Sequence, residues 1–195
     1  MTKKEEFIFH AKDSRWFNYM LFYEFVAQQH FNTYAEVGCG KGHSTFFLAQ
    51  AVLKDENTVI YAIDKFVSPL KEMYEFNKKP YPDKVKDIIH EIPGISWEVA
   101  HQFEDGYFDF VFIDADHAYE SVRKDILAYL PKVRKGGILA GHDYVESQPG
   151  VRKAVDEIFG NNKKVQIDYD EQTYTIGENV VLEKFPKSYC WYVEL

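Results

Sequence analysis

The sequence predicts an α/β fold built on a doubly wound, mostly parallel sheet with one late antiparallel strand. Segments of strand character alternate with segments of helical character, a pattern typical of a parallel sheet with helices on both faces. A glycine-rich turn joins the first such strand to a helix, as at the carboxyl edge of a parallel sheet. The chain has 195 residues, 46% of them hydrophobic, which is enough for one packed domain over residues 1–195.

The first element is a helix over Ser14–His30, because apolar residues recur there at helical spacing and Ser14 can cap its start. We interpret it as facing the core, and a helical lid over residues 1–31 is the alternative. Short apolar runs then predict strands, with a helical pattern between them. In order, these elements are a strand over Thr33–Val37, a helix over Ser44–Leu53 and a strand over Thr58–Ile63.

Residues 65–91 are rich in Tyr, Lys and Pro. Pro69, Pro80 and Pro82 break any long helix, so we expect an irregular lid or insertion with one short helix near Asp83–Ile89.

The second half continues the alternation of strands and helices. The run Phe108–Ile113 reads as a buried strand, and glycines at 136 and 137 lead into another. The expected elements are strands over Phe108–Ile113 and Ile138–Ala140, helices over Tyr119–Leu130 and Gly150–Phe159, and late strands near Val165–Ile167 and Val180–Phe185.

Composition excludes several classes of protein. The net charge of −8 disfavours sequence-independent binding of nucleic acid, because such binding needs basic patches. No apolar run reaches the roughly 18–20 residues that cross a bilayer. Cys39 and Cys190 are the only cysteines and make no disulfide framework, so we expect a reducing, cytoplasmic location.

The glycine-rich turn reads Glu36-Val-Gly38-Cys-Gly40-Lys-Gly42-His43. Glycines are needed where the backbone takes positive φ or approaches a ligand closely. The dinucleotide fingerprint places its third glycine where this chain has His43, which makes a nicotinamide-dependent oxidoreductase the least favoured interpretation. A purely structural turn is the alternative that the motif alone leaves open.

Polar residues end consecutive predicted strands. Asp64 ends the second strand, about 20 residues beyond the glycines, where an acidic side chain accepts hydrogen bonds from ribose hydroxyls. The segments Asp114–His117 and Gly141–Tyr144 end two later strands. Ligands of open α/β sheets bind outside the carboxyl ends of the strands, so these side chains predict one functional crevice.

The glycine motif resembles the first motif of class I S-adenosylmethionine (SAM)-dependent methyltransferases, whose fold is Rossmann-like. The runs Phe112–Tyr119 and Gly136–Tyr144, followed by Pro149-Gly150-Val151, resemble one group of them. This group contains the small-molecule O-methyltransferases related to macrocin and mycinamicin sugar methyltransferases and, more distantly, the caffeoyl-CoA and catechol enzymes. The resemblance covers roughly residues 34–159.

The resemblance implies a role for particular residues. A divalent cation, usually Mg²⁺, with Mn²⁺ as the second choice, would be held by Asp114, His142 and Asp143, and His117 would be the catalytic base. The residues that would bind SAM are Glu36, Gly38, Gly40, Gly42, Ser44, Asp64, Ser96 and Asp116.

The chain departs from the family pattern at two positions. His142 replaces a residue that is usually acidic or aromatic, and an imidazole suits Mn²⁺, Fe²⁺ or Zn²⁺ at least as well as Mg²⁺. Ile95 stands where the family has an aspartate that contacts the adenine amino group, which leaves Ser96, backbone and apolar packing to hold adenine.

We therefore expect a SAM-dependent, metal-assisted O-methyltransferase acting on a hydroxyl of a small molecule of sugar or phenolic type. Aligning the acceptor with the methyl group, activating it with a cation and removing its proton with an imidazole make coherent chemistry. The alternatives are a metal-independent N- or C-methyltransferase and a SAM-binding module without catalysis. The sequence identifies neither the acceptor nor the oligomeric state, and a homo-oligomer stays open. Aromatic residues that could pack an acceptor ring are Trp16, Tyr19, Tyr23, Tyr74 and Tyr81, and the alternative is that they belong to the core or to partly buried surface.

Overall fold

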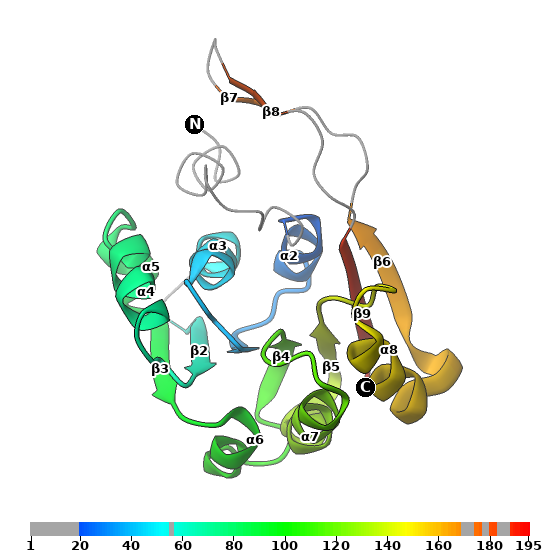
Figure 1. The fold of residues 1–195 in the computed structure, drawn as a ribbon. Helices are drawn as coiled ribbons and strands as arrows, with labels where there is room; N and C mark the ends of the chain where they lie inside the picture. Colours follow the sequence, from blue (N-terminus) through cyan, green and yellow to red (C-terminus); the bar gives the residue numbers. More distant parts are fainter. Residues whose placement is uncertain (1–19, 55–56, 169–173, 177–179, 183–187) are drawn as a thin grey trace.

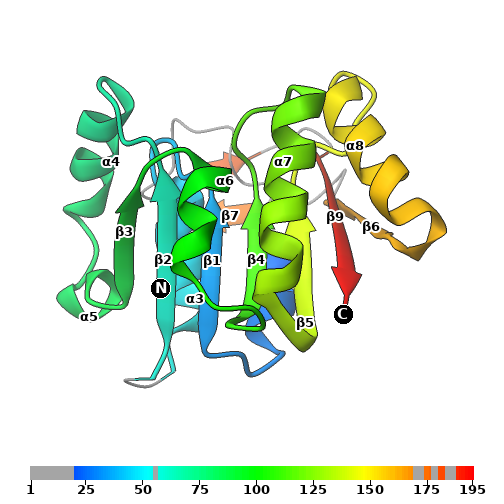
Figure 2. The same cartoon turned by 90° about the horizontal axis from the view of Figure 1, so that it is seen from below.

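The computed structural model describes residues 20–54, 57–168, 174–176, 180–182 and 188–195. Its main sheet has seven strands in the order β3-β2-β1-β4-β5-β9-β6 (Figures 1 and 2). Strand β9 runs antiparallel to both of its neighbours, and the other pairings are parallel. The strands are β1 Thr33–Val37, β2 Val59–Asp64, β3 Ile89–Pro93, β4 Phe108–Ile113, β5 Val133–Gly141, β6 Lys164–Asp168 and β9 Ser188–Glu194. The predicted Rossmann-like, doubly wound sheet with a late antiparallel strand is therefore confirmed.

Helices cover both faces of this sheet (Figure 1). Helices α2 (Met20–Ala27) and α3 (His43–Val52) lie on one face, with α4 (Leu70–Lys78) and α5 (Asp83–Lys86) beside α3. The opposite face carries α6 (Ser96–Val99), α7 (Tyr119–Tyr129) and α8 (Pro149–Phe159). Single turns of 3₁₀ helix lie at Ala100–Gln102, Leu130–Lys132 and Gly160–Asn162.

Strand β4 lies between β1 and β5, and every residue from Phe108 to Ile113 is buried. Alternate side chains point to opposite faces, so Phe110 joins the core beneath α2 and α3, while Val111 joins the core beneath α7 and α8. A strand buried on both faces reads as a continuous apolar run, which is why its predicted bounds were correct.

Helix α2 belongs to the core. Phe22 and Tyr23 are fully buried, and the ring of Phe22 lies 6.0 Å from that of Phe110. The core-facing interpretation is thus confirmed for the described part of the predicted helix. Trp16 and Tyr19 lie outside the described residues. Tyr23, Tyr74 and Tyr81 are core residues, as the alternative to packing an acceptor ring had it.

The short helix expected near Asp83–Ile89 is present as α5, but the rest of residues 65–91 is more regular than expected, since it contains α4 and β3. Helix α4 begins after Pro69 and α5 begins after Pro82, because proline is tolerated where a helix starts. Strand β3 pairs with β2 and forms an edge of the sheet. This strand was not predicted, because His90 and Glu91 interrupt its apolar residues.

The late strands expected near Val165–Ile167 and Val180–Phe185 are present as β6 and, over Val180–Leu182, as β8. Strand β8 pairs with β7 (Tyr174–Ile176) in a separate two-stranded sheet. The strand that joins β5 is the unpredicted β9, whose Cys190 and Trp191 are buried.

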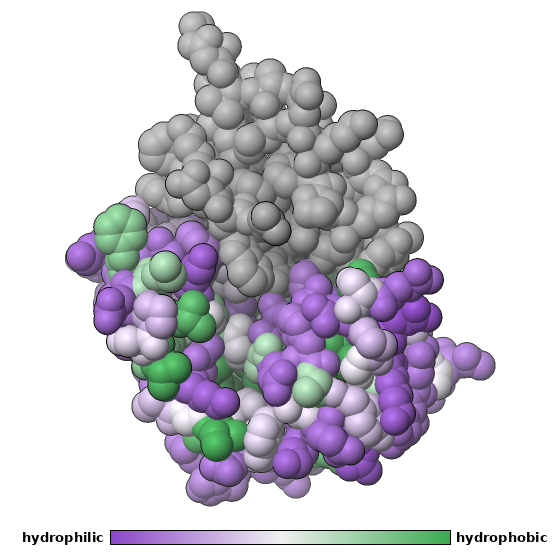
Figure 3. All heavy atoms as spheres, in the orientation of Figure 1, coloured by the Kyte–Doolittle hydropathy of each residue, from purple (hydrophilic) through white to green (hydrophobic). Residues whose placement is uncertain are grey.

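The described surface is mostly polar on the face drawn in Figure 3, with hydrophobic residues exposed on the side of α4. The apolar side chains exposed in and before α4 are Val67, Leu70, Met73 and Phe76. Among the described residues, no helix combines the length and apolar character needed to span a bilayer.

Candidate active site

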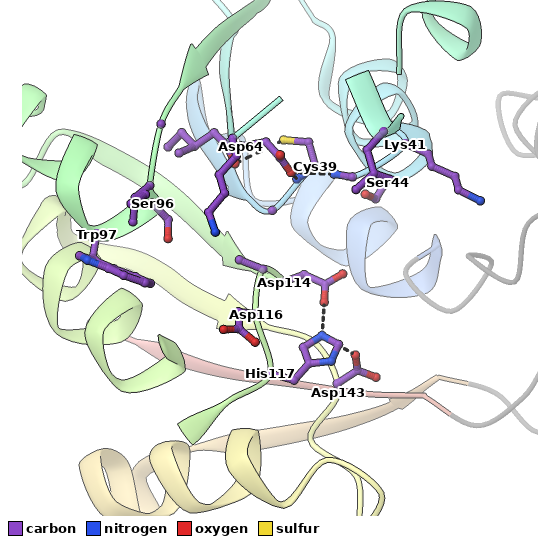
Figure 4. Close-up of a pocket in the computed structure, with 18 of the residues that line it drawn as sticks. Cys39, Lys41, Ser44, Asp64, Ser96, Trp97, Asp114, Asp116, His117 and Asp143 are labelled. Atoms are coloured by element: carbon purple, nitrogen blue, oxygen red, sulfur yellow. Dashed lines mark hydrogen bonds and ion pairs between the residues drawn. The ribbon is translucent and has the colours of Figure 1, made fainter. Parts of the chain in front are cut away.

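A cavity of about 420 Å³ opens at the carboxyl ends of the parallel strands (Figure 4). Six parts of the chain line it: the glycine loop after β1 with the start of α3, the end of β2, Leu70 at the start of α4, the turn between β3 and α6, the turn after β4, and Asp143 after β5. The cavity therefore lies where the sequence predicted a crevice, and it unites residues more than 100 positions apart.

The glycine loop passes very close to the turn after β4. Gly38 has a φ of +92°, and a Cβ on it would lie 2.2 Å from the carbonyl oxygen of Asp114. Gly42 has a φ of +81° and contacts Phe46 and Tyr74, which a Cβ would strike. Gly38 and Gly40 line the cavity, whereas Gly42 is outside the lining and serves packing at the start of α3.

Asp64 holds the loop in place. Its Oδ2 atom accepts the backbone N–H groups of Cys39 and Gly40, both at 2.9 Å, and its Oδ1 atom accepts that of Phe66 at 2.9 Å. Each carboxylate oxygen has two acceptor sites, so Oδ1 can accept a further donor from the cavity that Asp64 lines.

Glu36, which the sequence predicted to bind the cofactor, is buried beneath the loop and is not among the residues that line the cavity. Its carboxylate accepts hydrogen bonds from the hydroxyls of Thr45 and Tyr23, which ties β1 to α3 and α2. Burial raises the pKa of Glu36 to about 7, against the hydrogen bonds from Ser44 and Thr45 that lower it. Ser44 is buried and lines the cavity, as predicted.

Asp114, His117 and Asp143 converge at one end of the cavity (Figure 4). The His117 Nε2 atom lies 3.4 Å from Asp114 Oδ1 and 3.1 Å from Asp143 Oδ2. The hydrogen bond with Asp114 raises the pKa of His117 above its usual value. One nitrogen or oxygen atom from each of the three side chains lies within 4.8 Å of the others, close enough to surround a cation.

His142 lies beneath this cluster. Its backbone N–H donates to the Ile113 carbonyl at 3.1 Å, which extends the sheet and turns the side chain inward, so the residue is buried and does not line the cavity. The Nδ1 atom is 3.3 Å from Asp143 Oδ1 and 4.0 Å from Asp114 Oδ1. The pKa of Asp143 is lowered: burial raises it, and the hydrogen bond and charge of His142 outweigh that effect. Asp114, His117 and Asp143 thus have ligand atoms close to one another, and His142 lies behind them, near both carboxylates.

Asp116 lines the cavity and also organises the start of α7. Its carboxylate accepts the Ser121 hydroxyl at 2.7 Å and the Ala118 N–H at 3.2 Å. These hydrogen bonds, that of Ser121 above all, lower the pKa of Asp116.

Ile95, Ser96 and Trp97 line the opposite end of the cavity. The Ser96 hydroxyl donates to Asp125 on α7, which is fully buried. Sequence reasoning missed Asp125. The signal was an acidic residue at a core position of α7, on the face that carries Val122, Ile126 and Tyr129.

The arrangement therefore combines a glycine loop, an acceptor carboxylate at the end of β2, and an imidazole between two carboxylates. An imidazole so placed can accept a proton from a bound hydroxyl, and two carboxylates can hold a divalent cation.

Comparisons with known proteins agree with this arrangement. A family model described as a methyltransferase domain matches residues 35–144, which is more than half of the chain. No sequence among curated proteins matches the chain.

Solved structures show the same fold. O-methyltransferase TomG from Streptomyces achromogenes, in complex with SAM, is 15% identical with a TM-score of 0.65, over 90% of this chain and 79% of that one. An O-methyltransferase from Bacillus cereus, in complex with SAH, is 16% identical with a TM-score of 0.62, over 89% and 79%. Precorrin-6y C5,15-methyltransferase from Geobacter metallireducens is 13% identical with a TM-score of 0.62, over 88% and 87%.

The glycine motif lies within the matched residues, and the fold is that of solved methyltransferases. The resemblance read from the sequence is thereby confirmed at the level of the family: the chain belongs to the family of methyltransferase domains.

Proposed function

We propose that the protein transfers the methyl group of SAM to a hydroxyl of a small molecule of sugar or phenolic type. The observation that carries this proposal is the position of His117 between Asp114 and Asp143 at the edge of the cavity. A hydroxyl is a poor nucleophile at neutral pH, so a group that accepts its proton distinguishes O-methylation from simple binding of SAM.

We propose one orientation of SAM in the cavity. The methyl group of SAM lies near His117 in this orientation. The adenine then lies away from His117, beside Ile95, Ser96 and Trp97. The ribose then falls at Asp64, because β2 lies between β3 and β1. Gly38, Gly40, Ser44 and Asp116 border the remaining part of the cofactor. Glu36 and Gly42 do not line the cavity and support the loop from beneath, through hydrogen bonds of Glu36 to Thr45 and Tyr23 and through packing of Gly42 against Phe46 and Tyr74.

The residues near His117 fit a divalent cation. Asp114 and Asp143 supply hard oxygen donors, which suit Mg²⁺ or Mn²⁺, and a nitrogen from His142 or His117 lies near both carboxylates. A bound cation would lower the pKa of the acceptor hydroxyl. We assign the base to His117, which reaches the cavity, and the third ligand to the more deeply buried His142.

Transfer itself requires alignment of the acceptor oxygen with the methyl group and the sulfur. His117 accepts the hydroxyl proton, and the carboxylates of Asp114 and Asp143 stabilise the imidazolium that forms.

A C-methyltransferase is the second candidate, because the precorrin-6y enzyme has the same fold. N-methylation of a small molecule and SAM binding without catalysis are the remaining candidates. A cytoplasmic location, the exclusion of nucleic-acid substrates and a homo-oligomeric state stay predictions.

The test is in two stages. Calorimetry with S-adenosylhomocysteine, with and without Mg²⁺ or Mn²⁺, first measures cofactor binding. Transfer of labelled methyl from SAM to a panel of sugar and phenolic acceptors, with product NMR, then identifies the atom that is methylated. Absence of S-adenosylhomocysteine binding contradicts the proposal, and methylation of carbon or nitrogen acceptors alone supports a C- or N-methyltransferase instead.

A further inference from the structure

A buried serine–aspartate pair lies beside the part of the cavity that Ser96 and Trp97 line, away from His117 (Figure 4). The Ser96 hydroxyl donates to Asp125 Oδ1 at 2.5 Å, and the hydroxyl of Tyr129 donates to the Ser96 carbonyl at 2.9 Å. Asp125 is 0% exposed, whereas Ser96 lines the cavity. The pair thus connects the interior of α7 to the ligand-facing surface.

The buried carboxylate of Asp125 depends on the Ser96 hydroxyl for a hydrogen bond. Its Oδ2 atom is buried and has no hydrogen-bond partner among the described residues, so the serine hydroxyl satisfies one of only two carboxylate oxygens. Leaving a buried polar group without its partner is costly, so the hydroxyl stays turned toward Asp125.

The direction of this hydrogen bond determines what Ser96 offers the cavity. A hydroxyl has one hydrogen and two lone pairs, and the hydrogen is committed to Asp125. Ser96 therefore presents only an acceptor. The side chains beside it are the aliphatic Ile95 and the indole of Trp97, and neither of them accepts a hydrogen bond from a ring amino group.

We propose that Asp125 is a positioning residue that holds the Ser96 hydroxyl as an acceptor and so makes this end of the cavity select a purine with a ring amino group over one with a ring carbonyl. The inference rests on the proposed function, because it takes the bound purine to be that of SAM. Adenine donates from its amino group and satisfies Ser96. Hypoxanthine presents a carbonyl there, which faces the serine lone pairs and is rejected.

The competing explanation is that the pair only fastens α6 to α7. A fastening role affects stability and leaves the preference between the two purines unchanged. The ratio of two affinities therefore separates the explanations.

The experiment measures calorimetric affinities for S-adenosylhomocysteine and S-inosylhomocysteine at pH 8. Burial raises the pKa of Asp125 to about 7, so at pH 8 the carboxylate is ionised and accepts the serine hydrogen. We expect the wild type to prefer the adenosyl compound by about 10- to 100-fold. Asp125→Leu frees the hydroxyl to donate, and Ser96→Ala removes it, so both variants should bring the preference within about threefold of parity. Asp125→Asn keeps an oxygen that accepts the serine hydrogen and should retain most of the preference.

Ser68→Ala is the matched control, because Ser68 donates to the carboxylate of Glu72 in an exposed pair outside the cavity lining. Its preference should equal that of the wild type. A wild type without preference, or a wild-type preference in Ser96→Ala or in folded Asp125→Leu, overturns the inference and leaves the proposed function intact. A wild type that binds neither compound contradicts the proposed function itself.

Discussion

The backbone N–H of Gly40 donates to Asp64 Oδ2 at 2.9 Å, so the end of β2 holds the loop that follows β1. The same oxygen accepts the N–H of Cys39. Asp64 thus shapes the glycine loop, and we propose that its Oδ1 atom also accepts a ribose hydroxyl. Substitution of Asp64 therefore tests both the loop and the proposed ribose contact.

Asp64→Ala should weaken S-adenosylhomocysteine binding by about 1–3 kcal/mol, because charge-assisted hydrogen bonds are lost. Calorimetry measures the change. A 2′-deoxy analogue separates the two roles: if Asp64 binds the ribose, the substitution weakens the analogue less than the parent compound. Equal losses of affinity for the two compounds would mean that Asp64 only holds the loop. Unchanged affinity for S-adenosylhomocysteine would contradict the proposed contact with the ribose.

Gly38→Ala should destabilise the fold by about 1–3 kcal/mol more than Gly40→Ala. Both glycines have positive φ, so both substitutions carry the backbone cost, but only at Gly38 would the Cβ overlap backbone, 2.2 Å from the Asp114 carbonyl oxygen. Nothing lies within 4 Å of a Cβ at Gly40. Urea unfolding of the two variants checks the difference, and equal destabilisation would mean that the close approach of the loop is absent.

His117→Ala should lower the rate of methyl transfer by about 10²–10⁴-fold, the usual effect of removing a general base. S-adenosylhomocysteine affinity should stay within about threefold, because the residues proposed to bind the cofactor do not include His117. His101→Ala is the matched control, since His101 is exposed and does not line the cavity. Turnover of His117→Ala within a few-fold of wild type would place the base elsewhere.

Asp114→Asn and Asp143→Asn should each weaken Mn²⁺ binding by at least about tenfold, because each removes a charged oxygen donor. Calorimetric titration with Mn²⁺ checks this, and excess chelator should abolish transfer by the wild type. His142→Ala should also weaken the ion, whereas His117→Ala should retain it within about threefold. The opposite order of the two histidine variants would make His117 a ligand and contradict its role as base.

Asp125→Asn should become more stable relative to wild type as pH rises from about 4 to 7. Burial raises the pKa of Asp125 from 3.8 to about 7, so between these values the unfolded chain is ionised while the folded chain keeps the proton. Folding then takes up a proton, and the wild-type free energy of unfolding falls with rising pH by up to about 1.4 kcal/mol per unit. Asparagine does not titrate. Chemical unfolding at pH 4.5 and 7.5 measures the difference, and a gap between the proteins that does not change with pH would refute the shifted pKa.

The sequence alone predicted the fold class, the central strands and the place of the site. The apolar runs of β1 and β4 determined their bounds, because a parallel strand buried on both faces has little choice of residue type. The spacing of Gly38, Gly40 and Asp64 predicted a ligand crevice, because a loop and a strand end at the same sheet edge are close whatever the details of packing.

Tertiary structure decided what depends on side-chain direction and on partners distant in sequence. The polar residues His90 and Glu91 mask the strand pattern of β3, which is recognised only by its pairing with β2. Strand β9 is an apolar run, but its place beside β5 is set by pairing between residues about 50 positions apart. Spacing could not reveal that the backbone of His142 continues the sheet and buries its ring while His117 reaches the cavity. The role of Asp125 could not be predicted from the sequence, because its hydrogen bond with Ser96, 29 positions away, forms only when α7 packs against α6.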